Sequence, residues 1–386
     1  MDFDALLRQE LAQIASRGLR RQLAGPLPSH VVNYSSNDYL GLSTHPLLLE
    51  AGRSGLAVAG GAGAARLVGG DCAEHHALEA ALARFKGTEA ALLFSSGYQA
   101  NVGTIAALIG REDAVYSDAL NHASLIDGCR LSGAAIHVYR HVDTEHLASL
   151  LAQGTRFPRR LIVTDSIFGM DGDAAPLADL AHLARRHEAA LMVDEAHASG
   201  VYGPAGAGLL RATGVAADVQ LVTLGKALGG FGGAVIGSRS LIDLLINRAR
   251  TFIFTTALPP SVCTTTLAAL HLVAGPPGDA LRAQLFANAA RLHHALVALQ
   301  LRRPTDSPSP ILPLRAGTPE ASLSAARELL ARGCFVQAIR PPTVPEGTSR
   351  LRLTASAAHT PEQLDTLIAA LTELVDAGLL PTVVLP

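Results

Sequence analysis

Residues 221–237 read LVTLGKALGGFGGAVIG: a short apolar run, one lysine among small residues, and a second apolar run. Both runs have the character of buried strands, and a lysine in an exposed flexible loop rarely lies between two such segments. The surrounding glycines leave room for the backbone to pass close to a bound molecule. Because the sequence holds only two lysines, Lys86 and Lys226, chemistry that needs a primary amine has two candidates.

Lys86 has a structural explanation of its own. It closes an amphipathic helical pattern over residues 74–86 and precedes Gly87, the residue type that most often follows a helix. A cation in the last helical turn interacts favourably with the helix dipole. We therefore expect Lys86 to be a helix-end cation and Lys226 to be the reactive amine.

Short apolar runs alternate with helical segments from residue 90 onward. This alternation predicts an α/β fold with a mostly parallel sheet covered on both faces. The seven predicted strands cover residues 90–94, 114–116, 135–139, 161–164, 190–193, 221–224 and 234–236.

The chain divides into three predicted parts. Residues 1–43 form an N-terminal arm that begins with a helical pattern over 2–24, and residues 44–275 form a large domain. The sequence Gly-Pro-Pro-Gly at 275–278 is typical of a domain boundary. Residues 276–386 then mix helical patterns with short strands and predict a smaller α+β domain.

Composition limits the partners that we expect. The 386 residues carry a net charge of −2 and no basic run, which argues against nucleic acid or an acidic membrane surface. No apolar run reaches about 18 residues, so we expect no membrane span. The acidic residues near the start do not suit a signal peptide. The four cysteines are scattered and lack CxxC spacing, which indicates neither a zinc site nor disulfides and agrees with a cytoplasmic protein. His75 and His76 are adjacent and therefore poor joint ligands for a metal ion. We therefore expect no metal site.

Four polar clusters follow predicted strands: Ser95–Tyr98, Asn121–His122, Asp194–His197 and Thr223–Lys226. In sheets of this kind, ligands bind beyond the carboxyl ends of the strands. The first cluster precedes a predicted helix, whose N-terminal N–H groups could hold a phosphate, although a plain serine helix cap explains it equally well. Asp194 closes an apolar strand, where an unpaired carboxylate is costly, so we expect it to have a cationic partner.

The letters Asp-Glu-Ala-His at 194–197 also spell the signature of certain helicases. Those enzymes need a phosphate-binding loop of the form GxxxxGK[ST], whereas Lys226 is followed by Ala227 and Gln220 stands at the upstream glycine position. The helicase interpretation is therefore excluded. A phosphate cradle, a buried aspartate and a lysine at strand ends instead match the needs of pyridoxal 5'-phosphate: a covalent amine, a carboxylate that keeps the ring nitrogen protonated, and a phosphate site.

The chain resembles the α-oxoamine synthases, which are fold-type I (aspartate aminotransferase-like) pyridoxal-phosphate enzymes. These transferases join an amino acid to an acyl thioester with loss of carbon dioxide. The similarity covers nearly the whole length and includes residues 37–42 (NDYLGL), 94–101 (FSSGYQAN), 118–124 (DALNHAS), 170–173 (MDGD), 194–197 (DEAH), 223–226 (TLGK), 255–260 and 350–353 (RLRL).

The resemblance implies a role for each matching residue. Lys226 would bind the cofactor covalently and later remove the α-proton of the amino acid, and Asp194 would pair with the ring nitrogen. His197 would hydrogen-bond the ring hydroxyl oxygen, and His122 would stack on the ring. The implied phosphate contacts are Ser96, Gly97, Tyr98 and Thr223, with Thr255 or Thr256 from the second subunit of a homodimer whose active sites are shared. The implied contacts to substrate carboxylates are Asn37, Arg340, Arg352 and, in the N-terminal arm, Arg20 or Arg21.

Within the family, the chain is most similar to members that use L-alanine and a pimeloyl thioester, carried by coenzyme A or by an acyl carrier protein. The alternatives are members that use glycine with an acetyl or succinyl thioester, members that use serine with a long-chain thioester, and a cofactor-binding protein without catalysis. One position departs from the family: Gly169 stands where relatives often carry serine before MDGD. A hydrogen bond to the ring side is then missing or replaced by water, and the sequence assigns Gly169 no role.

Overall fold

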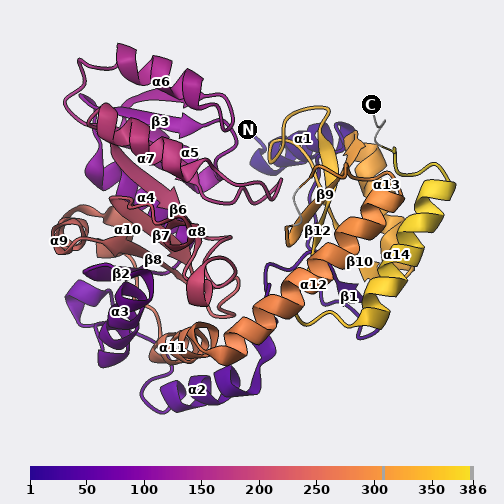
Figure 1. The fold of residues 1–386 in the computed structure, drawn as a ribbon, viewed down its shortest axis with the longest axis horizontal. Coiled ribbons are helices and arrows are strands. Elements are labelled where there is room, and N and C mark those ends of the chain that lie inside the picture. The colour runs from indigo at the N-terminus through magenta and orange to yellow at the C-terminus, as the bar shows by residue number, and fades with distance from the viewer. Residues whose placement is uncertain (307–308, 383–386) are drawn as a thin grey trace. The chain divides into compact units, whose positions relative to one another are not determined.

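The computed structural model describes residues 1–306 and 309–382. The chain forms two compact units (Figure 1). Unit 1 comprises Met1–Ser36, Met170–Gly172 and the chain from Leu285 onward, and unit 2 comprises Asn37–Gly169 and Asp173–Gln284. These divisions differ from the predicted boundaries at 43/44 and 275/276. The Gly-Pro-Pro-Gly segment opens helix α12 (Pro276–Ala298) instead of forming a linker, because proline is tolerated in the first helical turn.

Unit 2 is built on a seven-stranded sheet in the order β2-β8-β7-β6-β5-β3-β4. All seven predicted strands are present, so the predicted α/β fold is confirmed. β8 runs antiparallel to both of its neighbours, and the other pairs are parallel. The strands are β2 (Ala90–Phe94), β3 (Ala114–Asp118), β4 (Ala135–Tyr139), β5 (Arg160–Asp165), β6 (Ala190–Asp194), β7 (Val219–Thr223) and β8 (Gly233–Gly237).

Helices cover both faces of this sheet (Figure 1), because successive strand residues point to opposite sides. In β5, Leu161 and Val163 join the core under one layer of helices, while Ile162 joins the core under the other. The helices of the unit are α2 (Pro46–Leu56), α3 (Ala73–Lys86), α4 (Gly97–Leu108), α5 (Ala123–Ser132), α6 (Thr144–Gln153), α7 (Leu177–Arg186), α8 (Leu209–Thr213), α9 (Arg239–Arg248), α10 (Arg250–Ile253) and α11 (Pro260–Ala274), with 3-10 turns η1 (Leu42–Thr44), η2 (Arg66–Val68) and η3 (Pro204–Gly206).

Unit 1 holds a three-stranded antiparallel sheet in the order β11-β12-β9, and a parallel pair formed by β1 and β10. This mixture of helices and short strands agrees with the predicted α+β character. The strands are β1 (Val32–Asn33), β9 (Ile311–Gly317), β10 (Cys334–Phe335), β11 (Gln337–Ile339) and β12 (Ser349–Thr354), and the helices wholly within the unit are α1 (Phe3–Ser16), α13 (Pro319–Ala331) and α14 (Pro361–Asp376).

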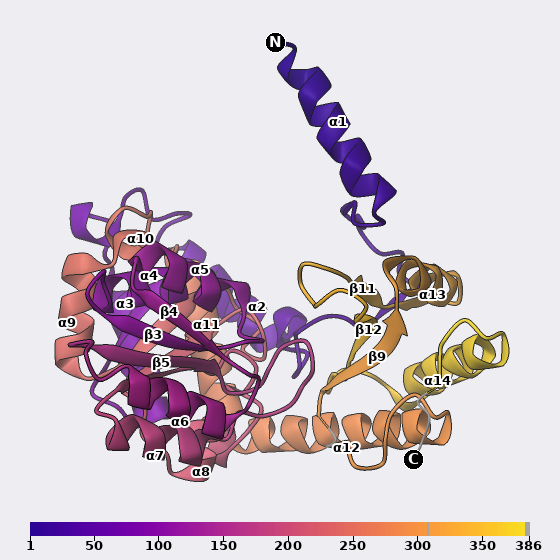
Figure 2. The ribbon, with the colours of Figure 1, turned by 90° about the horizontal axis from the view of Figure 1, so that it is seen from above.

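The N-terminal helix α1 buries none of its residues, and Figure 2 shows it extending away from the β9–β12 sheet of its own unit. It is shorter than the helical pattern over 2–24. Gly18 adopts the left-handed conformation at φ 65°, which ends the helix soon after Ser16.

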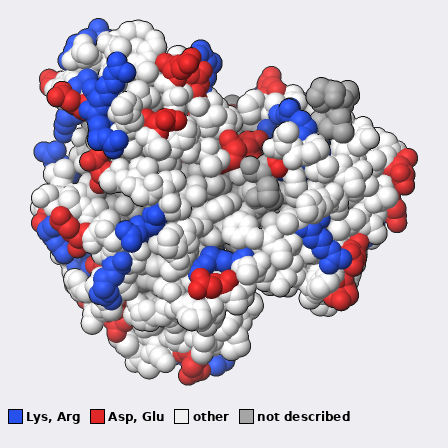
Figure 3. All heavy atoms as spheres, in the orientation of Figure 1, with Lys and Arg blue, Asp and Glu red and all other residues white. Residues whose placement is uncertain are grey.

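Surface charge is mixed in sign. On the face drawn in Figure 3, basic and acidic side chains are interspersed, as the net charge of −2 leads one to expect. Among the described residues, no helix is both long enough and apolar enough to cross a lipid bilayer.

Candidate functional site

The polar clusters meet at one edge of the unit 2 sheet. Asp194 is the last residue of β6 and Thr223 the last of β7, while β2 leads through Ser96 into α4. These strands run in the same direction, so their carboxyl ends lie at a common edge. His122 is the N-cap of α5, which follows β3 at this edge.

Lys226 lies next to His197 at this edge. Its Nζ is 3.0 Å from Nε2 of His197, and the other ring nitrogen, Nδ1, is 2.6 Å from the hydroxyl of Tyr39. Tyr39 belongs to the NDYLGL motif, but sequence reasoning gave it no role of its own. Its position beside His197 depends on a long-range contact that no local pattern reveals.

Asp194 is buried, with 3 % of its surface exposed. Its Oδ2 accepts a hydrogen bond from Nδ2 of Asn101 at 2.7 Å, and its Oδ1 accepts one from the backbone N–H of Ala196 at 2.9 Å. Both donors are uncharged. The expected cationic partner is thus not found in the described part of the chain, and the carboxylate is held by neutral hydrogen bonds.

Asn101 connects Asp194 to His122. Its Nδ2 also donates to Oγ of Ser124 at 2.9 Å, and that hydroxyl lies 2.7 Å from Nδ1 of His122. Burial lowers the pKa of His122, and the nearby amine of Lys226 lowers it further, against the opposing effect of Asp194. These effects disfavour the charged form of the His122 imidazole, which suits a ring that stacks on another ring.

Asp165 is a second buried carboxylate at this edge, and sequence reasoning missed it. It closes β5 and is the register partner of Asp194 across the β5–β6 pair. Its Oδ2 accepts a hydrogen bond from the backbone N–H of His122 at 2.8 Å. Burial raises its pKa well above the usual value, and the charge of Asp194 adds to the rise. The signal was available, because an acid ends this apolar strand just as Asp194 ends the next.

The first turn of α4 is the candidate phosphate site. The side chain of Ser96 caps this helix by accepting a hydrogen bond from the N–H of Gln99 at 3.1 Å, as the helix-cap interpretation expected. A Cβ on Gly97 would lie 2.4 Å from Cγ2 of Thr223, so the helix start packs directly on the end of β7. The hydroxyl of Tyr98 donates to Asp127 at 2.5 Å. What remains for an anion is the pair of first-turn N–H groups of Gly97 and Tyr98, which have no acceptor within the helix.

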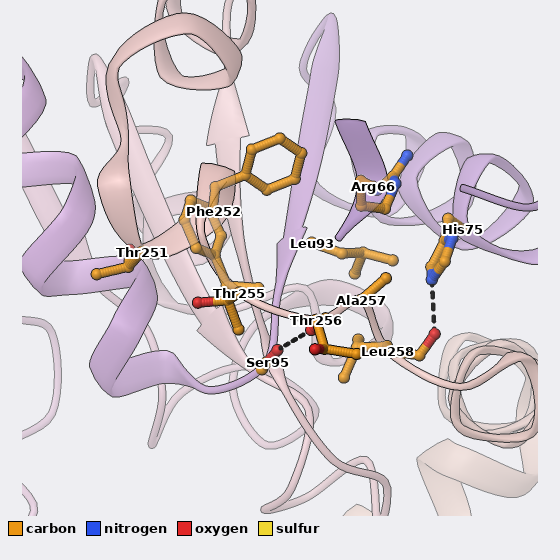
Figure 4. Close-up of a pocket in the computed structure, with 11 residues that line it drawn as sticks. Arg66, His75, Leu93, Ser95, Thr251, Phe252, Thr255, Thr256, Ala257 and Leu258 are labelled. Atoms are coloured by element: carbon orange, nitrogen blue, oxygen red, sulfur yellow. Dashed lines mark hydrogen bonds between the residues drawn. The ribbon is translucent and has the colours of Figure 1, made fainter. Parts of the chain in front are cut away.

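The segment that carries Thr255 and Thr256 is held close to this helix start (Figure 4). The hydroxyl of Ser95 donates to the carbonyl of Thr256 at 3.1 Å, and Nε2 of His75 lies 2.8 Å from the carbonyl of Leu258. Within one chain, the two predicted phosphate-binding segments are thus tied together. A phosphate contact made by Thr255 or Thr256 across a subunit boundary stays a prediction.

Lys86 is not the helix-end cation that we expected. Although it is the last residue of α3, its side chain is fully buried, and its Nζ donates to Oε2 of Glu195 at 2.6 Å. The helical pattern showed where α3 ends but not which way its last side chain points. As an amine buried in an ion pair, Lys86 is unsuited to react with a cofactor, and Lys226 is the remaining lysine.

The predicted substrate-binding residues fall in different units. Asn37 lies in unit 2, where its Oδ1 is 3.3 Å from the hydroxyl oxygen of Tyr39. Arg340 in unit 1 donates to the carbonyl of Gly18 at 2.6 Å, and Arg352 donates to Oγ1 of Thr354 at 2.9 Å. The two arm residues lie near Arg340: the carbonyl of Arg20 accepts from Arg340 at 3.4 Å, and Arg21 donates to the carbonyl of Pro341 at 3.5 Å. Their contacts to substrate stay predictions.

Comparison with known proteins agrees with this site. The profile of the family "Aminotransferase class I and II" matches residues 29–371. An 8-amino-7-oxononanoate synthase of Anaeromyxobacter dehalogenans is 54 % identical over 94 % of this chain and 93 % of the relative, and one of Methylococcus capsulatus is 49 % identical over 95 % and 97 %. A lysine-to-alanine variant of a serine palmitoyltransferase of S. paucimobilis, solved with a bound PLP–myriocin aldimine, superimposes with a TM-score of 0.90 at 31 % identity over 98 % of both chains. The chain therefore belongs to the class I and II aminotransferase family and, within it, to the group of the 8-amino-7-oxononanoate synthases.

Proposed function

We propose that the protein uses pyridoxal 5'-phosphate to condense L-alanine with a pimeloyl thioester, with loss of carbon dioxide, and so makes 8-amino-7-oxononanoate for biotin biosynthesis. The observation that carries the proposal is the placement of Lys226. Its Nζ lies 3.0 Å from His197 at the sheet edge where Asp194 ends β6. Identities of 54 % and 49 % to 8-amino-7-oxononanoate synthases over nearly the whole chain support alanine and a pimeloyl thioester as the substrates.

The residues at the edge fit this cofactor. Asp194 is a buried carboxylate whose described donors are neutral, so a protonated ring nitrogen would provide the charge that it lacks. Nearby, the first turn of α4 offers N–H groups to a phosphate. When bound, the cofactor supplies an electron-accepting ring that stabilises negative charge on the α-carbon of the amino acid.

The chain's own residues then have separate tasks. Lys226 would hold the cofactor covalently and, once its amine is free and neutral, would take the α-proton of alanine. Asp194 keeps a proton on the ring nitrogen, while Asn101 fixes the orientation of the carboxylate. His197 would donate to the ring hydroxyl oxygen, and the imidazole of His122 would lie against the ring face.

The partners follow from the same proposal. Asn37, Arg340 and Arg352 bind substrate carboxylates, and Arg20 or Arg21 meets the far carboxylate of the acyl chain. The active unit is a homodimer in which Thr255 or Thr256 reaches the phosphate of the other subunit. Coenzyme A or an acyl carrier protein carries the pimeloyl group, and the enzyme works in the cytoplasm.

Thiol release tests the proposal. Purified holoprotein is mixed with four substrate pairs: L-alanine with pimeloyl-CoA, glycine with acetyl-CoA, glycine with succinyl-CoA, and L-serine with palmitoyl-CoA. Rapid release with the first pair alone, lost in Lys226→Ala, is the expected result. Faster release with another pair would assign the chain to a different acyl transfer, and no release with any pair would indicate a cofactor-binding protein without catalysis. Replacing pimeloyl-CoA by the pimeloyl carrier protein then identifies the thioester.

A further inference from the structure

We propose that Tyr39 is a positioning residue that sets the protonation pattern of His197. By donating its hydroxyl proton to Nδ1, Tyr39 places the imidazole proton on Nε2, the nitrogen that faces Lys226. The consequence for catalysis rests on the function proposed above. The hydrogen-bond geometry itself belongs to unit 2 alone.

The contacts form a chain from Tyr39 through His197 to Lys226. The hydroxyl of Tyr39 lies 2.6 Å from Nδ1 of His197, and Nε2 lies 3.0 Å from Nζ of Lys226. Tyr39 is 1 % exposed and His197 is 7 % exposed, so the first hydrogen bond is shielded from water. Shielding strengthens such a bond and raises the cost of leaving either partner unsatisfied.

The direction of the first hydrogen bond follows from the number of protons available. A tyrosine hydroxyl has one proton, and Oδ1 of Asn37 and Nδ1 of His197 are both acceptors within its reach. Oδ1 of Asn37 is 3.3 Å away, whereas Nδ1 of His197 is 2.6 Å away. The shorter contact has the length of a strong hydrogen bond and the longer one does not. We therefore assign the hydroxyl proton to the contact with His197.

This assignment affects the amine of Lys226. A neutral imidazole carries one donor and one acceptor nitrogen, so an accepting Nδ1 leaves the proton on Nε2. An ammonium on Lys226 has no lone pair and cannot accept a hydrogen bond from an N–H group on Nε2, so the two groups repel each other. A neutral amine has a lone pair and can accept that hydrogen bond. Tyr39 thereby favours the neutral amine that proton removal requires.

Gly169 leaves the space that the ring of His197 occupies. A Cβ on Gly169 would lie 2.4 Å from Nε2 of His197 and 3.1 Å from each of its two ring carbon neighbours. With this backbone, a Cβ at this position would require either the ring of His197 or the Gly169 segment to shift. The residue that departs from the family pattern thus has a role: its missing side chain makes room for the imidazole.

Other titratable groups lie near Lys226 and must be kept constant in any test. Asp165 and His122 each interact electrostatically with this amine and with Asp194. Replacing Tyr39 by phenylalanine removes one oxygen and leaves all three in place. Tyr34→Phe is the matched control, because Tyr34 is also 1 % exposed and its hydroxyl donates to the carbonyl of Gln363, within unit 1, at 2.5 Å.

The main test measures the reactivity of Lys226 against pH in the full-length chain before cofactor is added. Limited acylation, quantified by mass spectrometry with the N-terminal amine as internal standard, gives the pH midpoint of this one lysine. We expect Tyr39→Phe to raise the midpoint by about one pH unit, a tenfold fall in the neutral fraction. Gly169→Ala should raise it as well, and Tyr34→Phe should leave it unchanged. A midpoint in Tyr39→Phe equal to that of the unchanged protein overturns the proposal.

A second measurement needs no substitution at Tyr39. Nitrogen-15 NMR of histidine-labelled protein distinguishes a proton on Nε2 from one on Nδ1, and the signal lost in His197→Gln identifies the residue. A neutral ring protonated on Nε2 is expected, and a proton on Nδ1 contradicts the proposal.

Thiol release separates this inference from the proposed function. If the protein releases no thiol but Tyr39→Phe raises the pH midpoint of Lys226, the role of Tyr39 stands without the proposed function. If the protein releases thiol but Tyr39→Phe leaves that midpoint unchanged, the role of Tyr39 is refuted. In an active protein, Tyr39→Phe should lower kcat with little change in KM for alanine.

Discussion

Lys86 and Glu195 form an ion pair in which neither side chain is exposed to solvent, with Nζ 2.6 Å from Oε2. Nζ also donates to Oγ of Ser199 at 2.7 Å and to the carbonyl of Ala207 at 2.8 Å, so the ammonium is fully hydrogen-bonded. Burial lowers the pKa of Lys86, and the charge of Glu195 opposes that effect. Because Glu195 directly follows Asp194, the pair anchors the segment that carries two residues of the proposed site.

Lys86→Met should strongly destabilise the protein. The substitution leaves the carboxylate of Glu195 buried without its cation, which costs about 3–5 kcal/mol of unfolding free energy. Urea denaturation followed by circular dichroism measures this loss. The double variant Lys86→Met/Glu195→Leu should recover much of it, because it removes both charges, and Arg8→Met, at the exposed pair with Asp4, should change little. A Lys86→Met protein that unfolds at the same urea concentration as the unchanged protein would contradict the structural role of the pair.

His141 should make stability depend on pH in the alkaline range. Burial alone would lower its pKa, but hydrogen bonds to Asp118 at 2.9 Å and Asp173 at 2.8 Å outweigh burial and raise the pKa to about 10. A pKa raised on folding contributes stability that is complete below the unfolded value of about 6.5 and is lost as pH rises through the folded value. The stability lost in His141→Asn should therefore be largest below pH 6.5 and shrink toward pH 10.

Thermal unfolding at several pH values measures this difference. His182→Asn, on the exposed side of α7, is the control and should show no such trend. A loss in His141→Asn that stays constant between pH 6 and 10 would rule out a charged imidazole between the two carboxylates.

Asn101→Ala should weaken both the fold and the retention of the cofactor. Without Nδ2, Oδ2 of buried Asp194 loses its side-chain donor, which costs about 1–3 kcal/mol of unfolding free energy. The carboxylate also loses the contact that orients it, so the dissociation constant for pyridoxal 5'-phosphate should rise. Denaturation and cofactor titration measure the two effects, with Asn247→Ala, an exposed residue of α9, as control. Unchanged cofactor affinity would show that Asn101 does not orient Asp194.

The fold was largely readable from local sequence. Each strand of the unit 2 sheet is a short apolar run, and such runs form buried strands wherever helices cover both faces. Local patterns do not encode strand order or direction, so the antiparallel placement of β8 emerged only from the structure. The segment Gly-Pro-Pro at 275–277 is equally compatible with a linker and with the start of a helix, so the start of α12 at Pro276 also emerged only from the structure.

The site was predictable where a residue has both unusual chemistry and a position at a strand end. Lys226 and Asp194 meet both conditions. Tyr39 and Asn101 do not, because their importance lies in contacts to His197 and Asp194 that are far apart in sequence. Lys86 was misjudged for the same reason, since its partner Glu195 is 109 positions away. Long-range pairing of polar side chains depends on tertiary structure, which a periodic pattern does not describe.

Borohydride reduction of the holoprotein tests the central claim most directly. The reagent fixes the linkage between the cofactor aldehyde and the amine that holds it, and digestion with mass spectrometry then locates the label. The account predicts one pyridoxyl group per chain, on the peptide that contains Lys226, and none on the peptide that contains Lys86. A label on Lys86, or no label on Lys226 in protein that has bound the cofactor, would contradict it.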